Sequence, residues 1–348
     1  MTRPLRIVTF NVALFREEPM ALVRELEGVG SAQLRAVVEV IRRLDADVLV
    51  LNELDYDDEH RALRLLNEVW LGRVMTPYPY AFTAPVNTGV PSGRDLVKDE
   101  SLAVGRSSPL GFGAFPGQYG MAVLSRVPID VEACRTFRQF LWRDMPGADL
   151  PRWPDGSAFY DADDLAVLPV SSKSHWDLVL RGEDRPFHLL VSHPTPPAFD
   201  GPERRNVCRN GDEIRFWVDY IGGAEYPVDD AGRRGGLSPD AAFVVAGDLN
   251  ASPIAGDSRP GAIQALLGHA RVQAVRPISP GAVGVRPDVA DADQHTADWG
   301  MRSDYLLPSR HWRVGDTGVF WPVPEDPFAE VVARASDHRA VWLDCDRI

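Results

Sequence analysis

The sequence predicts an α+β protein in which two packed, mixed β-sheets are flanked by helices. Three observations lead to this fold class. Short runs rich in apolar and β-branched residues, typical of buried strands, recur along the chain. Segments with helical spacing are fewer. Polar residues stand at the ends of several strand-like runs, and the order of the patterns does not fit one parallel sheet with strict strand–helix alternation.

The first 170 residues contain three predicted strands, one helix and two insertions. Apolar residues at helical spacing predict a helix over 31–44, with Ser31 as its N-cap. Aromatic residues among prolines and aspartates mark 138–170 as an irregular insertion, and the Gly, Pro and Ser content of 84–118 predicts a long loop. The strands are expected at 5–12, 46–54 and 120–130.

The second half of the chain predicts a hairpin, two helices and three more strands. The hairpin joins residues 174–180 to 186–194. The helices are expected over 211–223, which ends in a glycine pair, and over 261–268. The remaining strands are expected at 241–250, 302–309 and 338–345. We find no internal repeat and no interdomain linker, and we therefore expect one domain over 1–348.

The bulk composition is that of an ordinary globular protein, with 45% hydrophobic and 25% charged residues. A net charge of −13 disfavours loose electrostatic binding to nucleic acid. Of the basic residues, only Lys98 and Lys173 are lysines. The three cysteines are widely spaced, which does not indicate a zinc ribbon or a redox pair.

The sequence contains no run of 18 apolar residues, so we expect no membrane span. The first residues, "MTRPLRIVTFNV", lack the apolar core and the cleavage site of a secretory signal. The chain as given is therefore expected to be cytoplasmic, with secretion left open if a signal had been removed. The oligomeric state is not predicted.

Polar residues stand at the ends of six apolar runs. Side chains at positions i and i+2 of an extended segment share a face, so Asp248 and Asn250 in "VVAGDLN" are expected to converge. Taken singly, each such residue is also an ordinary turn or cap residue. The residues are Asn11, Glu53, His193, Asp248 with Asn250, Asp304, and Asp337 with His338.

Seven motifs together resemble the endonuclease/exonuclease/phosphatase superfamily, and in that family's order they cover nearly the whole chain. They are "TFNV", "LNELD", "GMAVLSR", "LLVSHP", "VAGDLNASP", "RSDYLLPS" and "SDHRAVW". The resemblance implies a four-layer α/β/β/α sandwich. It also implies hydrolysis of phosphoester bonds with a divalent metal, most often Mg²⁺, with Mn²⁺ or Ca²⁺ as alternatives.

The resemblance also implies a role for each polar residue. Glu53 would be the principal metal carboxylate, with Asn11 and Asp337 beside it. Asp248 and Asn250 would align the attacking water and the phosphate. His338 would contact the scissile phosphate, with Asp304 orienting it. His193 resembles the second histidine of the nuclease and sphingomyelinase branches.

These residue types suit phosphoester hydrolysis. Mg²⁺ prefers oxygen ligands and keeps several waters, so one or two carboxylates suffice. A histidine held by a carboxylate keeps one tautomer and stays protonated near an anion. The general base is left open between Asp248 and the Asp304–His338 pair. No substrate-binding residue is assigned.

Several other residues are candidate substrate contacts. Arg204, Arg205 and Arg209 could reach an anionic substrate or simply face solvent. Lys173 and His175 share a face if extended, as substrate contacts or as cross-strand surface residues. Tyr119, before "GMAVLSR", is expected to line the cleft.

We favour a small phosphorylated metabolite or a lipid headgroup as the substrate, because the chain is acidic and its two insertions suggest a restricted pocket. A nuclease that cleaves DNA or RNA is the first alternative. A non-catalytic binding protein built on the same fold is the second.

Overall fold

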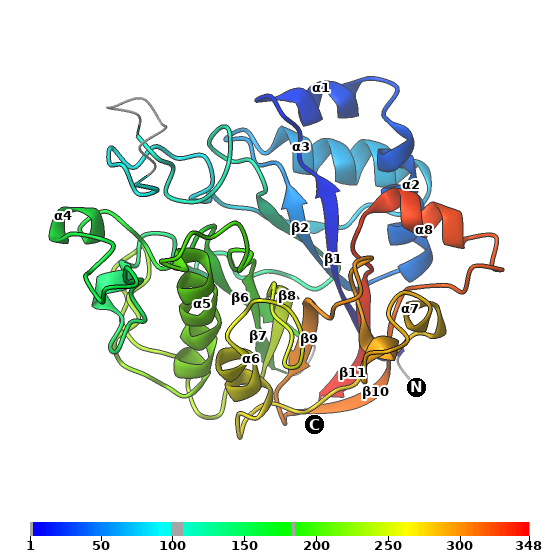
Figure 1. The fold of residues 1–348 in the computed structure, drawn as a ribbon. Helices are drawn as coiled ribbons and strands as arrows, with labels where there is room; N and C mark the ends of the chain where they lie inside the picture. The colour runs from blue at the N-terminus through cyan, green and yellow to red at the C-terminus, as the bar shows by residue number, and fades with distance from the viewer. Residues whose placement is uncertain (1–2, 99–106, 183–184, 348) are drawn as a thin grey trace.

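A computed structural model of the chain describes residues 3–98, 107–182 and 185–347. Two β-sheets pack face to face, and helices cover the outer face of each sheet (Figure 1). The layers therefore follow the order α/β/β/α, which confirms the predicted fold class.

The first sheet has six strands in the order β10-β11-β1-β2-β4-β3. β1 and β2 are parallel, and the other neighbours are antiparallel, so the sheet is mixed. The strands are β1 (Leu5–Leu14), β2 (Val48–Leu54), β3 (Tyr80–Phe82), β4 (Met121–Ser125), β10 (Trp312–Val319) and β11 (Val341–Arg347).

The second sheet has five strands in the order β5-β6-β7-β8-β9. β7 and β8 are parallel, and the predicted hairpin is the antiparallel pair β6–β7. The strands are β5 (Arg135–Thr136), β6 (His175–Arg181), β7 (Pro186–Ser192), β8 (Phe243–Asp248) and β9 (Asp304–Pro308).

The helices divide between the two outer faces. α1 (Ala21–Glu27), α2 (Ala32–Leu44) and α8 (Ala329–Ala335) pack on the first sheet, and α5 (Arg205–Ile221) and α6 (Pro260–Leu267) pack on the second. Ser31 caps α2 as predicted, accepting a hydrogen bond from the Leu34 amide. The shorter helical segments are α3 (Arg61–Arg64), η1 (Leu65–Trp70), η2 (Leu71–Arg73), η3 (Trp142–Asp144), α4 (Ala162–Leu165), α7 (Pro280–Val283) and η4 (Ala292–Gln294). In the described ranges, no helix has the length and apolar character needed to cross a membrane.

The predicted start of α5 is wrong. The helix begins at Arg205, well before residue 211, and ends at Ile221. Arg204 at its N-cap is left-handed and supplies no side-chain cap. The Asp200 carboxylate does so from outside the helix, accepting hydrogen bonds from the amides of Asn206 (2.8 Å) and Val207 (3.0 Å). A cap this far from the helix leaves no standard signal in the sequence.

Arg209 ties the two insertions together. Its guanidinium donates to the carbonyl of Leu110 in the first insertion and to the carbonyls of residues 169–171 at the end of the second. The Arg209 guanidinium is therefore bound to backbone carbonyls in this structure. The described parts of the first insertion, 84–98 and 107–118, contain no helix or strand; residues 99–106 lie outside the described residues.

Candidate functional site

Strand alternation brings the predicted polar residues to one end of the interface between the sheets. Alternate side chains of a strand share a face, and the polar residues continue the faces that fill the core between the sheets. The core residues two or four positions away are Ile7 for Asn11, Ala246 for Asp248, Val191 for His193 and Leu306 for Asp304.

Asp248 connects the two sheets. Asn11 Nδ2 donates to Asp248 Oδ2 at 3.1 Å, and the Asp248 amide donates to Asn52 Oδ1 at 3.1 Å. All three residues are buried. Sequence reasoning missed Asn52, although it follows Val48 and Val50 at the spacing of the same strand face. Its Nδ2 has no hydrogen-bond partner among the described residues.

Glu53 reaches the site because its backbone breaks this alternation. Its φ of 60° is left-handed, which is rare for a residue with a Cβ and is seen at functional sites. The side chain turns toward the second sheet, where Glu53 Oε1 lies 3.8 Å from His193 Nε2. Burial raises the pKa of Glu53, a shift opposed by the nearby positive charge of His338.

Asn250 also departs from the extended geometry that we predicted. The strand ends at Asp248, and Asn250 is left-handed with a φ of 51°. The two residues still interact, because the Asn250 amide donates to Asp248 Oδ1 at 2.9 Å. Asn250 Nδ2 donates to the Pro194 carbonyl at 3.1 Å, which fixes the carboxamide against the segment after His193.

His338 is held by Asp304. Asp304 pairs with Asp248 in the β8–β9 register, so both carboxylates lie at the same end of the sheet. His338 Nδ1 donates to Asp304 Oδ2 at 2.8 Å, which leaves Nε2 facing Asp248 Oδ2 at 3.6 Å. This hydrogen bond fixes one tautomer and one orientation of the His338 ring.

The surroundings of the site raise the pKa of both His338 and Asp248. Burial opposes the charged form of His338, but the carboxylates of Asp304 and Asp248 outweigh it and raise its pKa to about 10. Burial raises the pKa of Asp248 to about 7, against the opposing influence of His338. At neutral pH His338 is therefore a proton donor, and Asp248 is near its midpoint.

His193 lies between the carboxylates without a hydrogen bond to either. Its Nε2 is 3.5 Å from Asp248 Oδ2 and 3.8 Å from Glu53 Oε1, which exceeds hydrogen-bonding range. Neither ring nitrogen has a hydrogen-bond partner among the described residues. Burial lowers the pKa of His193 well below its usual value, so the ring is neutral. Separations of this size leave polar atoms facing a shared space that a water or an ion can bridge.

The donor set fits a divalent cation. Glu53, His193 and Asp248 form one group of ligand atoms within 4.8 Å of one another, and Asp248, Asp304 and His338 form a second. A cation there would favour the ionised carboxylates, whose pKa burial otherwise raises. Glu53 and Asp248 supply the oxygen ligands that magnesium prefers.

Asp337, which the resemblance assigns to the metal, lies at the edge of the site. Its side chain is exposed, and it belongs to neither group of converging ligand atoms in the described chain. Its charge still raises the pKa of both Glu53 and His338, so it lies close to them.

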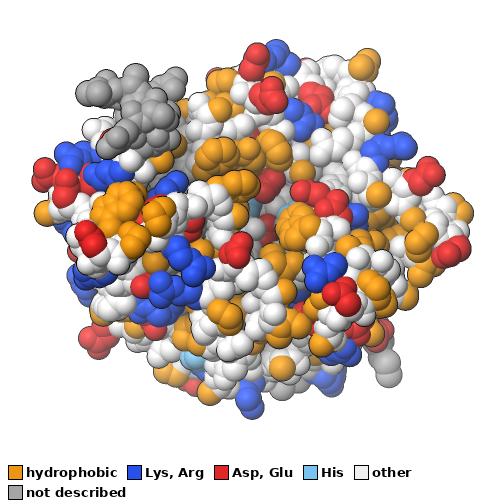
Figure 2. Space-filling model, in the orientation of Figure 1, with side chains coloured by type: hydrophobic (Ala, Val, Ile, Leu, Met, Phe, Trp, Pro, Cys, Tyr) orange, Lys and Arg blue, Asp and Glu red, His pale blue; other side chains and the backbone are white. Residues whose placement is uncertain are grey.

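Aromatic side chains stand on two sides of the site. The ring of Trp299, 45% exposed, meets that of His338 edge-on at 5.1 Å between centroids. On the other side, the Tyr119 ring lies 4.5 Å from that of Phe15. Burial raises the pKa of Tyr119, and the charge of Glu53 raises it further, so these two side chains lie near each other. Figure 2 shows a hollow between the layers, bordered by hydrophobic side chains with acidic groups inside.

Asp55, which the sequence analysis did not single out, holds the backbone at Tyr119. Its carboxylate accepts hydrogen bonds from the amides of Arg16 (2.8 Å) and Tyr119 (3.1 Å). Burial raises its pKa to about 7. Tyr119 itself is left-handed, with a φ of 56°.

Lys173 and His175 are both buried, so their interpretation as surface residues is wrong. His175 packs against α5, where its Nε2 donates to the Glu213 carbonyl at 2.8 Å and its ring contacts Phe216 and Trp217. Burial lowers the pKa of His175 to about 4. His175 is therefore a neutral core residue, whereas Lys173 lies near the carboxylates.

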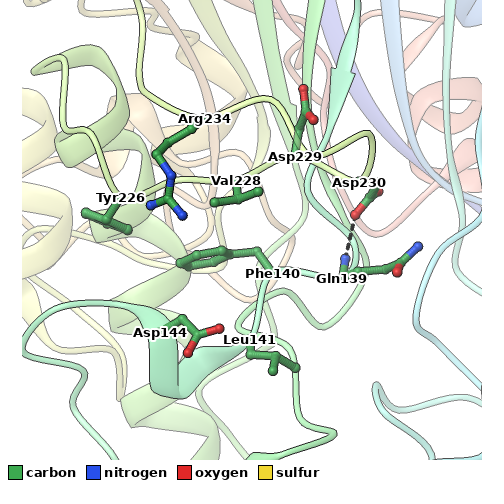
Figure 3. Close-up of a pocket in the computed structure, with 10 residues that line it drawn as sticks. Gln139, Phe140, Leu141, Asp144, Tyr226, Val228, Asp229, Asp230 and Arg234 are labelled. Atoms are coloured by element: carbon green, nitrogen blue, oxygen red, sulfur yellow. Dashed lines mark hydrogen bonds between the residues drawn. The ribbon is translucent and has the colours of Figure 1, made fainter.

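A separate hollow of about 670 Å³ lies between residues 139–144 and 226–234 and includes none of the predicted site residues (Figure 3). Two of its three acidic groups, Asp229 and Asp230, have close partners. Asp229 forms ion pairs with Arg135 and Arg233. Asp230 accepts hydrogen bonds from the backbone amides of Arg138 and Gln139. We therefore place the functional site at the end of the two sheets.

The chain belongs to the Endonuclease/Exonuclease/phosphatase family, whose profile matches residues 8–338. A search of curated proteins finds no match.

Solved structures share the fold at low identity. An endonuclease/exonuclease/phosphatase from Beutenbergia cavernae DSM 12333 matches with a TM-score of 0.57 and 19% identity, over 99% of this chain and 72% of that one. A family protein from Leptotrichia buccalis C-1013-b matches with a TM-score of 0.54 and 16% identity, over 98% and 99%. The human Nocturnin catalytic domain with bound sulfate anion matches with a TM-score of 0.50 and 14% identity, over 99% and 94%.

Proposed function

We propose that this protein uses a divalent metal, Mg²⁺ in the first place, to hydrolyse a phosphoester bond. The site is the cluster of polar side chains at one end of the interface between the two sheets. The observation that carries the proposal is the hydrogen-bonded chain from Asn11 through Asp248, together with the Asp304–His338 pair beside it. Buried acid–base pairs with strongly shifted pKa values, placed in a cleft, are typical of catalytic sites.

Each residue has a chemical role in this proposal. Glu53 would hold the metal, with Asn11 and Asp248 next to it, and the bound cation would draw charge from the phosphate oxygens. His338, protonated and oriented by Asp304, donates through Nε2 to a phosphate oxygen as negative charge develops. We assign Asp337 a supporting electrostatic role.

Asp248 is the better candidate for the general base. Its pKa of about 7 suits a group that must accept a proton near neutral pH, whereas His338 already carries its proton. Asn250 and His193 contact the same region and would align the water and the phosphate.

For the substrate we propose a small phosphorylated metabolite or a lipid headgroup. The net charge of −13 gives no favourable field for a polyanion. Trp299 and Tyr119 offer aromatic surface for the organic part of a small ester.

A substrate panel tests this proposal. We would measure Mg²⁺-, Mn²⁺- and Ca²⁺-supported hydrolysis of phosphomonoesters, small phosphodiesters and plasmid DNA. We expect turnover of a small ester, lost in His338→Ala and retained in His60→Asn, a control at an exposed histidine. Rapid plasmid nicking with small esters untouched would favour the nuclease. If no ester is cleaved, the non-catalytic binding protein becomes the better account.

A further inference from the structure

Lys173 is a buried cation without a direct partner. Its side chain is 6% exposed, and within the described chain no hydrogen bond or ion pair involves its ammonium. The only other lysine, Lys98, has its ammonium 2.6 Å from Asp164 Oδ2. Burying an ammonium without a partner costs several kcal/mol, on the order of the penalty for a desolvated ion, so its place calls for an explanation.

The backbone fixes where Lys173 lies. The Asn87 amide donates to the Lys173 carbonyl at 3.0 Å. In the β6–β7 pair His175 faces Ser192, so Lys173, two residues before His175, lies at the end of the pair where His193 and Pro194 follow Ser192. The Pro194 carbonyl is the group that accepts from Asn250 Nδ2. Lys173 therefore sits next to the segment that connects His193 with Asn250.

The charge of Lys173 acts on the site residues. Burial, the larger effect, raises the pKa of Glu53 and lowers that of His193, and the charge of Lys173 acts to lower the pKa of both. Glu213 is the strongest opposite charge near it, yet no ion pair forms, because the Glu213 carboxylate already accepts from Ser172 and from the Thr195 amide. The three N–H donors of the ammonium remain available to an acceptor.

We propose that Lys173 binds a non-bridging oxygen of the substrate's phosphate group. The assignment rests on the proposed function and extends it, because it adds a phosphate-binding residue from the start of β6. An anionic oxygen is the acceptor that would compensate a buried ammonium. His338 lies in the segment after α8, and Lys173 lies just before β6, so the two would contact the phosphate from different parts of the fold.

The test is binding of inorganic phosphate to the Mg²⁺-loaded protein, measured by calorimetry and as inhibition of ester hydrolysis. The variants are Lys173→Met, Lys173→Gln and Lys173→Arg, with Lys98→Met as the matched control. Arg94 still pairs with Asp164 in the control. Thermal unfolding checks that each variant is folded, and Lys173→Gln replaces Lys173→Met if the latter is not.

We expect removal of the charge to weaken phosphate binding about tenfold or more, the scale of one charged hydrogen bond. Lys173→Arg retains binding within about threefold, because it keeps the charge. Lys98→Met binds like the wild type. Mg²⁺ affinity without phosphate is unchanged or tighter in Lys173→Met, because a nearby positive charge is gone.

If Lys173→Met binds phosphate like the wild type while the wild type cleaves esters, the assignment of Lys173 is wrong and the proposed function stands. A change confined to Mg²⁺ affinity also contradicts it, since Lys173 would then only tune the metal site. If the wild type neither cleaves esters nor binds phosphate, the proposed function itself fails.

Discussion

At the scale of single residues, three buried side chains set the protonation of the site. His338 is held in its charged form by Asp304 and Asp248, while burial makes Asp248 a weaker acid than a free aspartate. His338 and Asp248 thus offer a proton donor and a proton acceptor at neutral pH, which general acid–base catalysis on a phosphoester requires.

The first prediction concerns pH. Catalysis needs ionised Asp248 and protonated His338, so kcat/KM should rise through the pKa of Asp248 and fall through that of His338, near 10. The metal-free pKa of Asp248 is about 7, and a bound cation favours the carboxylate, so the rise should lie below pH 7 with Mg²⁺. A pH series of kcat/KM checks this, and a profile flat from pH 7 to 11 contradicts it.

The second prediction isolates Asp304. Asp304→Asn removes a charge that raises the pKa of His338, so the alkaline limb should move to lower pH. We expect turnover at neutral pH to fall by about 10²-fold. Asp163→Asn, at an exposed carboxylate on α4, is the control. An unmoved alkaline limb in Asp304→Asn would show that Asp304 does not control the proton of His338.

At the scale of elements, the ends of strands and helices decide what the site contains. β1, β7, β8 and β9 each deliver one polar residue to the same end of the core, and α5 covers the outer face of the second sheet. The start of α5 depends on Asp200, which lies outside the helix.

The third prediction tests this cap. Asp200→Ala removes acceptors for two amides at the start of α5 and should lower the free energy of unfolding by about 1 kcal/mol. Urea denaturation measures the change. Asp257→Ala, at an exposed aspartate in another loop, should have little effect. Equal stability of the two variants would mean that Asp200 does not stabilise the helix.

Apolar, β-branched runs in the sequence predicted most of the longer strands, though not β10, and the polar residues at the ends of such runs included Asn11, Asp248 and Asp304. The same pattern also marked Glu53 and Asn250, but it could not predict the left-handed backbone of either residue, which breaks the strand alternation. Such conformations arise from tertiary contacts, as at Asn250, whose carboxamide binds the Pro194 carbonyl of a distant segment. The role of Arg209 also depends on carbonyls far away in the chain.

At the scale of the whole molecule, contacts between segments distant in sequence hold the two sheets and the two insertions together. Arg209 joins α5 to both insertions through backbone carbonyls, and Asp248 joins the sheets through Asn11 and Asn52. These contacts make the geometry of the site depend on the packing of segments that are distant in sequence.

The fourth prediction tests the Arg209 contacts. Lysine cannot reproduce the fork of the guanidinium, so Arg209→Lys should leave buried carbonyls unsatisfied and lower the free energy of unfolding by about 3 kcal/mol. Arg204→Lys, at an exposed arginine with one weak carbonyl contact, is the control. Chemical denaturation compares them. A loss below about 0.5 kcal/mol would show that Arg209 is not required for this packing.

The central claim is that Asp248, bound to both sheets, lies in a metal-dependent phosphoesterase site. The most direct measurement is hydrolysis of a small phosphoester across a Mg²⁺ titration, for the wild type and Asp248→Asn, with Asp163→Asn as the control. We predict that the wild type and the control show Mg²⁺-dependent turnover and that Asp248→Asn loses about 10³-fold or more. Wild-type turnover that is independent of metal, or retained in a folded Asp248→Asn variant, would contradict this account.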